Sequence, residues 1–217
     1  VYSEHCWLGD ACTPEAVRAL GARLTGLDPA AYEAFGAFYA DAEDHRTGKG
    51  LFYCDPLYPL TFGLWDLRGY ADTLAQGLAV LQGRRGDPRC DYAWLLLAIA
   101  QKKLAWIEAL RPAYKADDRA KIRYMAQTLL PELCALYEQF FAVFRAQWEA
   151  ANKRNGWEAH CFRIGGILKR LEDAQLELLR WADGETAAIE ALEEEPRCAL
   201  RRGGRQDYPM FTSVQYQ

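Results

Sequence analysis

Apolar residues recur every three or four positions through four long segments of this chain, and this helical period is its most constraining feature. Capping residues, glycines or prolines bound the segments, which span 67–81, 87–112, 117–152 and 162–182. In the second segment Lys102 and Lys103 are predicted to lie opposite the apolar face, and Pro131 should kink or split the third. Long helices joined by short turns predict an all-α fold, an antiparallel bundle of about four long helices.

Shorter elements surround this bundle. Thr13-Pro14 and Asp28-Pro29 each place a capping residue before a proline, which predicts lead-in helices within residues 1–45. Residues 46–66 should be an irregular connection, since Pro56, Pro59 and Gly63 interrupt it, and the polar stretch 41–50 should be an exposed loop. The bundle is then expected over 67–195, with an extended tail over 196–217.

Composition excludes several classes of protein. With 51% hydrophobic and 26% charged residues, the 217-residue chain can build a core without disulfides. A net charge of −4 with dispersed basic residues argues against nucleic acid as a partner, and the longest apolar run, nine residues at 92–100, is too short to span a membrane. Seven cysteines with no C-x-x-C predict reduced thiols and a cytoplasmic location. The start at Val1, without Met or a signal pattern, suggests an excised or processed chain.

Catalytic and metal-binding patterns are weak. The motifs of serine hydrolases, P-loop proteins, dinucleotide-binding proteins and zincins are missing, so we assign no catalytic residue and no cofactor. The cluster Asp41, Glu43, Asp44 and His45 could bind a hard cation, but its spacing fits a solvated acidic loop better. His5 with Cys6 and Cys12 lacks a second ligand pair, and Asp117-Asp118 suits a helix cap better than a carboxylate pair. No metal ligand is therefore assigned.

The glycine pair Gly165-Gly166 stands out inside a helical segment. Each glycine costs a helix about 1 kcal/mol relative to alanine, so a close approach by a neighbouring backbone is the favoured explanation. An anion site at a helix N-terminus beside Arg163 is the alternative.

Two segments resemble a known family. The stretch Asn152–Leu171 carries N-K-R-N-G-W and then F-R-I-G-G-I, and Leu51–Leu57 reads L-F-Y-C-D-P-L. Both are similar to the C-terminal helical domain of bacterial glycoside hydrolase family 20 β-N-acetylhexosaminidases, and Tyr2–Cys6 resembles the exit from their catalytic barrel. The resemblance makes Asp55, Trp157, His160, Arg163, Gly165 and Gly166 candidates for structural or interface roles.

What the resemblance implies is a parent enzyme that removes terminal N-acetylhexosamine by substrate assistance, in an N-terminal (β/α)8 barrel that carries an Asp-Glu pair. No adjacent Asp-Glu after a strand occurs here, so this chain would be an inactive accessory domain. Its partner would be the barrel of the same polypeptide, through which it meets the N-acetylhexosaminide substrate. The alternative is a stand-alone helical interaction module unconnected with any enzyme.

Overall fold

A computed structural model describes residues 13–39, 47–57, 60–61, 67–194 and 197–198. The chain begins there with short helices, namely α2 (Pro14–Thr25), α3 (Pro29–Gly36), the 3-10 turn η2 (Ala37–Tyr39) and α4 (Thr47–Tyr53). Thr13 and Asp28 cap α2 and α3 with side-chain oxygens, as their position before proline predicts.

Longer helices follow and make up most of the structure. They are α5 (Leu67–Gln82), α6 (Pro88–Lys115), α7 (Arg119–Tyr124), the π-helical turn η3 (Met125–Leu129), α8 (Leu130–Ala151) and α9 (Trp157–Ala182), with α10 (Glu190–Glu193) closing the series. The predicted all-α class is confirmed. No described helix is both long enough and apolar enough to cross a bilayer.

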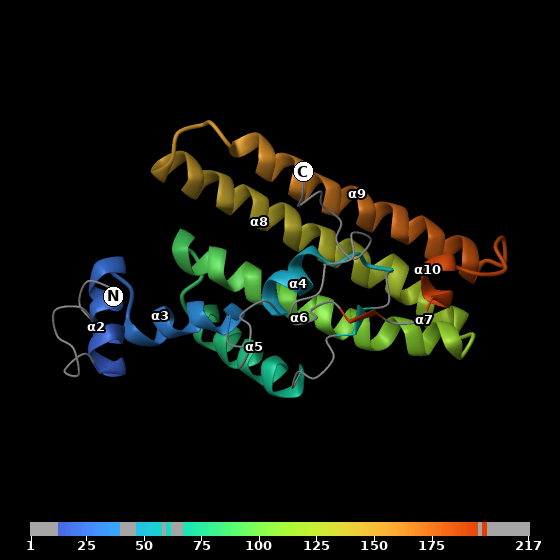
Figure 1. The fold of residues 1–217 in the computed structure, drawn as a ribbon, viewed down its shortest axis with the longest axis horizontal. Helices are drawn as coiled ribbons and strands as arrows, with labels where there is room; N and C mark the ends of the chain where they lie inside the picture. Colours follow the sequence, from blue (N-terminus) through green and yellow to red (C-terminus); the bar gives the residue numbers. More distant parts are fainter. Residues whose placement is uncertain (1–12, 40–46, 58–59, 62–66, 195–196, 199–217) are drawn as a thin grey trace.

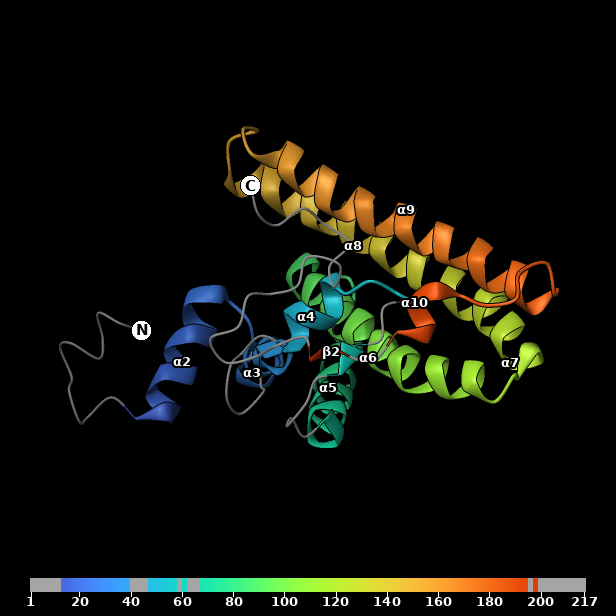
Figure 2. The same ribbon diagram turned by 45° about the vertical axis from the view of Figure 1, so that its right-hand side comes forward.

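Helix α6 occupies the middle of the structure. It packs against α4, α5 and α8, and α8 in turn packs against α9. Figures 1 and 2 both show α8 and α9 side by side as a hairpin above α6, with α5 beneath it. One continuous core of buried side chains runs through these helices, from Ala31 of α3 to Leu192 of α10.

The predicted break at Pro131 takes the form of a π-helical turn. Proline has no N–H to donate to the carbonyl four residues earlier, so a regular α-helix would leave that carbonyl unpaired. The turn η3 lies directly before Pro131, and the N–H of Leu130 bonds to the carbonyl of Met125, five residues back. The wider turn divides α7 from α8 without ending the helical path.

A short parallel ladder joins two distant segments. Strand β1 (Leu60–Thr61) pairs with β2 (Arg197–Cys198), with Leu60 opposite Arg197 and Thr61 opposite Cys198. The start of the predicted tail is therefore extended, and residues 199–217 lie outside the described part of the chain.

Several predicted boundaries were wrong. The loop expected over 41–50 and the irregular connection expected from residue 46 contain α4, which packs on α6 and η2. Gly48 and Gly50 are buried, and Gly48 lies against Phe38 of η2. Helix α6 continues through Pro112 to Lys115, since a proline this close to the end of a helix removes only one backbone hydrogen bond. Helix α9 begins at Trp157, five residues earlier than the sequence suggested.

Candidate functional site

The segment Leu51–Leu57, which contains the candidate Asp55, runs through the centre of the molecule. It leaves α4 after Tyr53 and continues as non-helical backbone. Leu51, Cys54 and Leu57 have no solvent exposure. Buried backbone outside a helix or sheet leaves carbonyl groups that require hydrogen-bond donors, so the position of this segment depends on side chains that reach it from elsewhere.

Helix α6 supplies two of those donors. The ammonium group of Lys103 donates to the carbonyl of Cys54, and the indole N–H of Trp106 donates to the carbonyl of Pro56 over 2.7 Å. Lys103 is 0% exposed, so this hydrogen bond is made in the protein interior, away from water. The two side chains lie nearly one turn apart on the helix and hold carbonyls two residues apart in the segment.

Helix α8 supplies a third donor. The hydroxyl of Tyr137 donates to the carbonyl of Phe52, and the two rings meet edge to face with centroids 5.0 Å apart. Burial raises the pKa of Tyr137 well above its usual value, so the hydroxyl keeps the proton that it donates.

Asp55 is held by α9. Its carboxylate accepts from Nε of Arg170 over 2.7 Å, and its other oxygen accepts from the backbone N–H of Leu57 over 2.9 Å. Arg170 also binds Asp173 and Glu177 on its own helix. Burial opposes the charge on Arg170, but the attraction of Asp55 and the hydrogen bonds to Asp55 and Glu177 raise its pKa above the usual value. The carboxylate therefore serves as one half of an ion pair.

The cysteine beside Asp55 is not a nucleophile. Burial raises the pKa of the Cys54 thiol despite the nearby charge of Lys103, and its Sγ lies 3.2 Å from the carbonyl of Leu51. A protonated thiol with no solvent exposure has no path to a substrate.

Two other candidates, Trp157 and His160, form an aromatic cluster at the far end of the α8–α9 hairpin. The His160 ring meets Phe144 and Trp148 at 4.8 Å and Trp157 at 5.8 Å between centroids. Burial, and then the positive charge of Arg163, lower the pKa of His160. A neutral imidazole among aromatic rings suits packing of the hairpin end.

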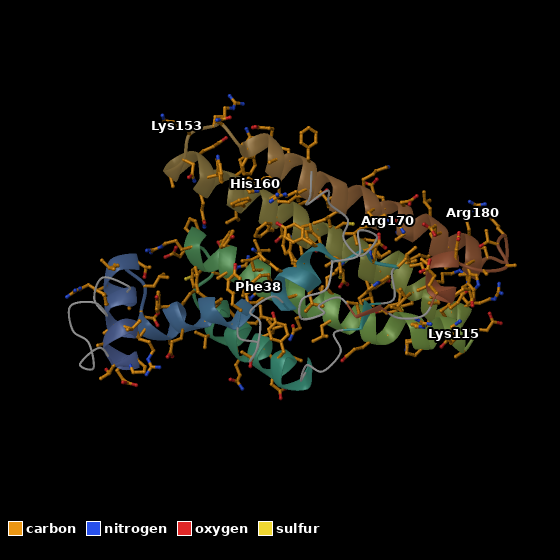
Figure 3. All side chains as sticks on the ribbon, viewed as in Figure 1. Phe38, Lys115, Lys153, His160, Arg170 and Arg180 are labelled. Carbon is orange, nitrogen blue, oxygen red and sulfur yellow. The ribbon has the colours of Figure 1, made fainter. Side chains whose placement is uncertain are left out.

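The sequence candidates therefore divide into two groups. His160 and Arg170 are labelled at separate places along α9 in Figure 3, and ten residues of helix separate them by about 15 Å. Asp55 belongs to the group around Arg170, whereas Trp157, His160 and Arg163 belong to the hairpin end.

The segment and its donors all lie within one family match. Residues 41–207, more than three-quarters of the chain, match the model of the glycoside hydrolase 20C C-terminal domain. The chain belongs to this family. No curated protein matches the chain. The match includes α4 and all the long helices but excludes α2 and α3.

The structure of this glycoside hydrolase 20C C-terminal domain tests the role proposed for the glycine pair at Gly165. A Cβ at Gly165 would meet nothing within 4 Å, so the prediction of close packing is wrong there. The alternative anion site is also wrong, because α9 starts at Trp157 and both glycines lie inside it. Gly166 is half-buried, and close packing at that residue stays a prediction.

Of the possible metal-binding or catalytic clusters considered in the sequence, the structure describes only Asp117-Asp118. Asp118 caps α7 by accepting from the N–H of Lys121 over 3.0 Å, and Asp117 pairs with Arg119. Capping therefore explains Asp118, as predicted, whereas Asp117 forms an ion pair. The clusters at 41–45 and at residues 5, 6 and 12 fall outside the described residues, and within those that are described no three His, Cys, Asp or Glu side chains gather as a metal site.

Sequence reasoning missed the donors that hold the Leu51–Leu57 segment. Lys103 was expected on the exposed side of its helix beside Lys102, yet Lys102 reaches Glu132 at the surface while Lys103 is buried. Lys103, Trp106 and Leu110 fall on one helical face at three- and four-residue spacing, and that spacing was the available signal. For Tyr137 and Arg170 the sequence carried no signal, because their partners are 85 and 115 residues away.

Proposed function

We propose that this chain is the non-catalytic helical accessory domain of a β-N-acetylhexosaminidase. The observation that carries the proposal is the family match over residues 41–207, which covers α4 and all the long helices and so most of the packed core. The family is named as a C-terminal domain, so a catalytic domain is expected to precede it in the same polypeptide.

In this proposal the chemistry belongs to the catalytic domain. Substrate-assisted hydrolysis requires a Glu that protonates the leaving oxygen and an Asp that orients the 2-acetamido group as nucleophile. The buried carboxylate of this chain cannot take either role, because Asp55 is already bound by Arg170 and by the N–H of Leu57.

The location proposed for the protein is cytoplasmic. Four cysteines in the described part of the chain, Cys54, Cys90, Cys134 and Cys161, are free thiols. Free thiols support a reducing compartment.

The test is an assay of two proteins with an aryl N-acetylglucosaminide. The complete natural polypeptide should hydrolyse it, and the 217-residue chain should release no more aryl alcohol than buffer does. Sequencing the gene upstream of the Val1 codon should show a (β/α)8 pattern with an Asp-Glu pair. An unrelated upstream domain, or turnover by the 217-residue chain that is lost on substituting one of its own Asp or Glu residues, would overturn the proposal.

A further inference from the structure

The outer face of helix α9 is exposed in the described part of the chain. On its inner side the helix packs against α7, η3 and α8. Figures 1 and 2 both show α9 at the outer edge of the molecule, with α8 between it and α6. Exposed residues follow one another along the outer face at alternating spacings of four and three, namely Glu158, Phe162, Gly165, Lys169, Glu172 and Leu176. We call this row the α9 seam.

The spacing of the α9 seam is the one by which two helices pack along each other. Residues that recur every 3.5 positions on average stay on one side of a helix over several turns. Phe162 is 80% exposed and Leu176 is 61% exposed. Exposed apolar residues that are scattered singly are ordinary, but these two lie four turns apart on the same face of one helix.

Gly165 has no partner within the described part of the chain that accounts for it. Glycine weakens the interior of a helix relative to alanine. A Cβ at this position would meet nothing within 4 Å, so no neighbour uses the space that the glycine leaves. A second helix laid along the α9 seam would find a notch there, wide enough for a large side chain. Leu176, three turns further along the seam, is a side chain of that kind.

The α9 seam is complementary to a second copy of itself in the antiparallel direction. We place the two-fold axis midway between Lys169 and Glu172, so that residues whose numbers add up to 341 lie opposite each other. Leu176 of each copy then faces the notch at Gly165 of the other. Lys169 of each copy faces Glu172 of the other, and both side chains are exposed, at 81% and 59%.

This alignment also covers the second exposed apolar side chain. Phe162 of each copy faces Leu179 of the other, which is half-buried and packs against the core from the inner side. Sliding the copies by one heptad, to a sum of 334, would place Phe162 opposite Glu172. A parallel pair would place Lys169 opposite Lys169 and Glu172 opposite Glu172, and like charges repel. The antiparallel alignment about the Lys169–Glu172 midpoint is therefore favoured.

We propose that the α9 seam binds a second copy of this chain, antiparallel, with Leu176 of each copy in the notch at Gly165 of the other. The inference does not rest on the hydrolase function. One helix face from each copy buries less than about 1,200 Å² in total, which is typical of weak, transient complexes. The dissociation constant should therefore be of the order of 100 µM, and the chain should be monomeric at a few micromolar.

Sedimentation velocity of the 217-residue chain tests the proposal between about 5 µM and about 500 µM, a range that brackets this dissociation constant. A reducing agent prevents the exposed thiol of Cys161 from cross-linking two copies. The sedimentation coefficient should rise from that of a monomer towards that of a dimer. A chain that stays monomeric over the whole range overturns the inference and leaves the α9 seam to a different partner, such as a preceding domain.

A lysine in the notch should prevent the association. Leu176→Lys should raise the dissociation constant by about tenfold or more, because it replaces the apolar side chain that faces Gly165 with a charge. Leu24→Lys is the matched control, since Leu24 is also exposed but lies on α2, and it should leave the dissociation constant unchanged. Circular dichroism shows whether both variants keep the helical fold. Equal effects of the two substitutions overturn the inference.

Exchanging the two central charges tests the antiparallel alignment. Lys169→Glu places a carboxylate opposite Glu172 of the other copy, and Glu172→Lys places an ammonium group opposite Lys169. Each substitution alone should raise the dissociation constant by about fivefold or more, since like charges then meet twice in the dimer. The double variant restores opposite charges and the net charge of the parent, so it should recover most of the association. A double variant as weak as the single ones overturns the proposal.

Discussion

The carboxylate of Asp55 and the guanidinium of Arg170 lie 2.7 Å apart although 115 residues separate them in the sequence. The contact ties the segment that precedes the bundle to its last long helix. Together with the donors from α6 and α8, it means that three long helices hold the end of α4 and the irregular backbone that follows it. The segment Leu51–Leu57 is thus part of what fixes the helices relative to one another.

Replacing Arg170 with Met should destabilise the fold by about 3 kcal/mol, near the low end for breaking a buried ion pair. The low end applies because the Arg170 side chain is 26% exposed and water partly screens the carboxylate that remains. The free energy of unfolding in urea measures the loss.

Two further variants test whether the loss of stability in Arg170→Met comes from the broken ion pair. Lys169→Met removes the neighbouring surface pair with Glu172, in which Lys169 is 81% exposed, and should change stability by less than about 0.5 kcal/mol. Asp55→Asn in the Arg170→Met background should recover part of the loss, since it removes the unpaired charge. Equal effects of Arg170→Met and Lys169→Met would contradict a structural role for the Asp55 pair.

The helices could be predicted from the sequence because their signals are local. Caps such as Thr13 and Asp28, and the break before Pro131, depend on residues within one or two turns. The missed features depend on contacts between distant segments. Nothing near Lys103 in the sequence shows that an irregular segment passes beside it. Around Gly48 the helix propensities of the residues favour a loop, but packing against η2 stabilises helix α4 there instead.

Gly48→Ala should destabilise the fold by about 1–3 kcal/mol through overpacking. A Cβ there would collide with the carbonyl oxygen of Phe38, which the Tyr70 hydroxyl also binds over 2.9 Å. Gly165→Ala is the control in open space, and it should stabilise α9 by about 0.5–1 kcal/mol because alanine favours helix. Thermal unfolding should show a lower melting temperature for Gly48→Ala and a higher one for Gly165→Ala. A higher melting temperature for Gly48→Ala would show that α4 does not pack closely on Phe38.

Tyr137→Phe should cost about 1–2 kcal/mol because it leaves the buried carbonyl of Phe52 without its donor. The phenyl ring would keep the edge-to-face contacts, so the variant isolates the hydrogen bond. Tyr124→Phe removes a hydroxyl from a side chain that is 56% exposed, and it should be neutral within about 0.5 kcal/mol. Urea unfolding of the two variants side by side provides the comparison. Indistinguishable midpoints would mean that the Phe52 carbonyl finds another donor.

The stability of the domain should fall as pH decreases below 6.5, in part through His160. Burial and the charge of Arg163 lower the pKa of His160 below its usual value of 6.5, so the unfolded chain binds this proton more readily than the folded one. The stability that the neutral imidazole provides is therefore complete above pH 6.5 and is lost as pH falls through the lowered pKa of the folded state. His160→Gln removes the titration, so its melting temperature should fall less than that of the parent between pH 7.5 and pH 5. The comparison uses thermal unfolding at both pH values, and parallel losses in the two proteins would exclude His160 as a source of the pH dependence.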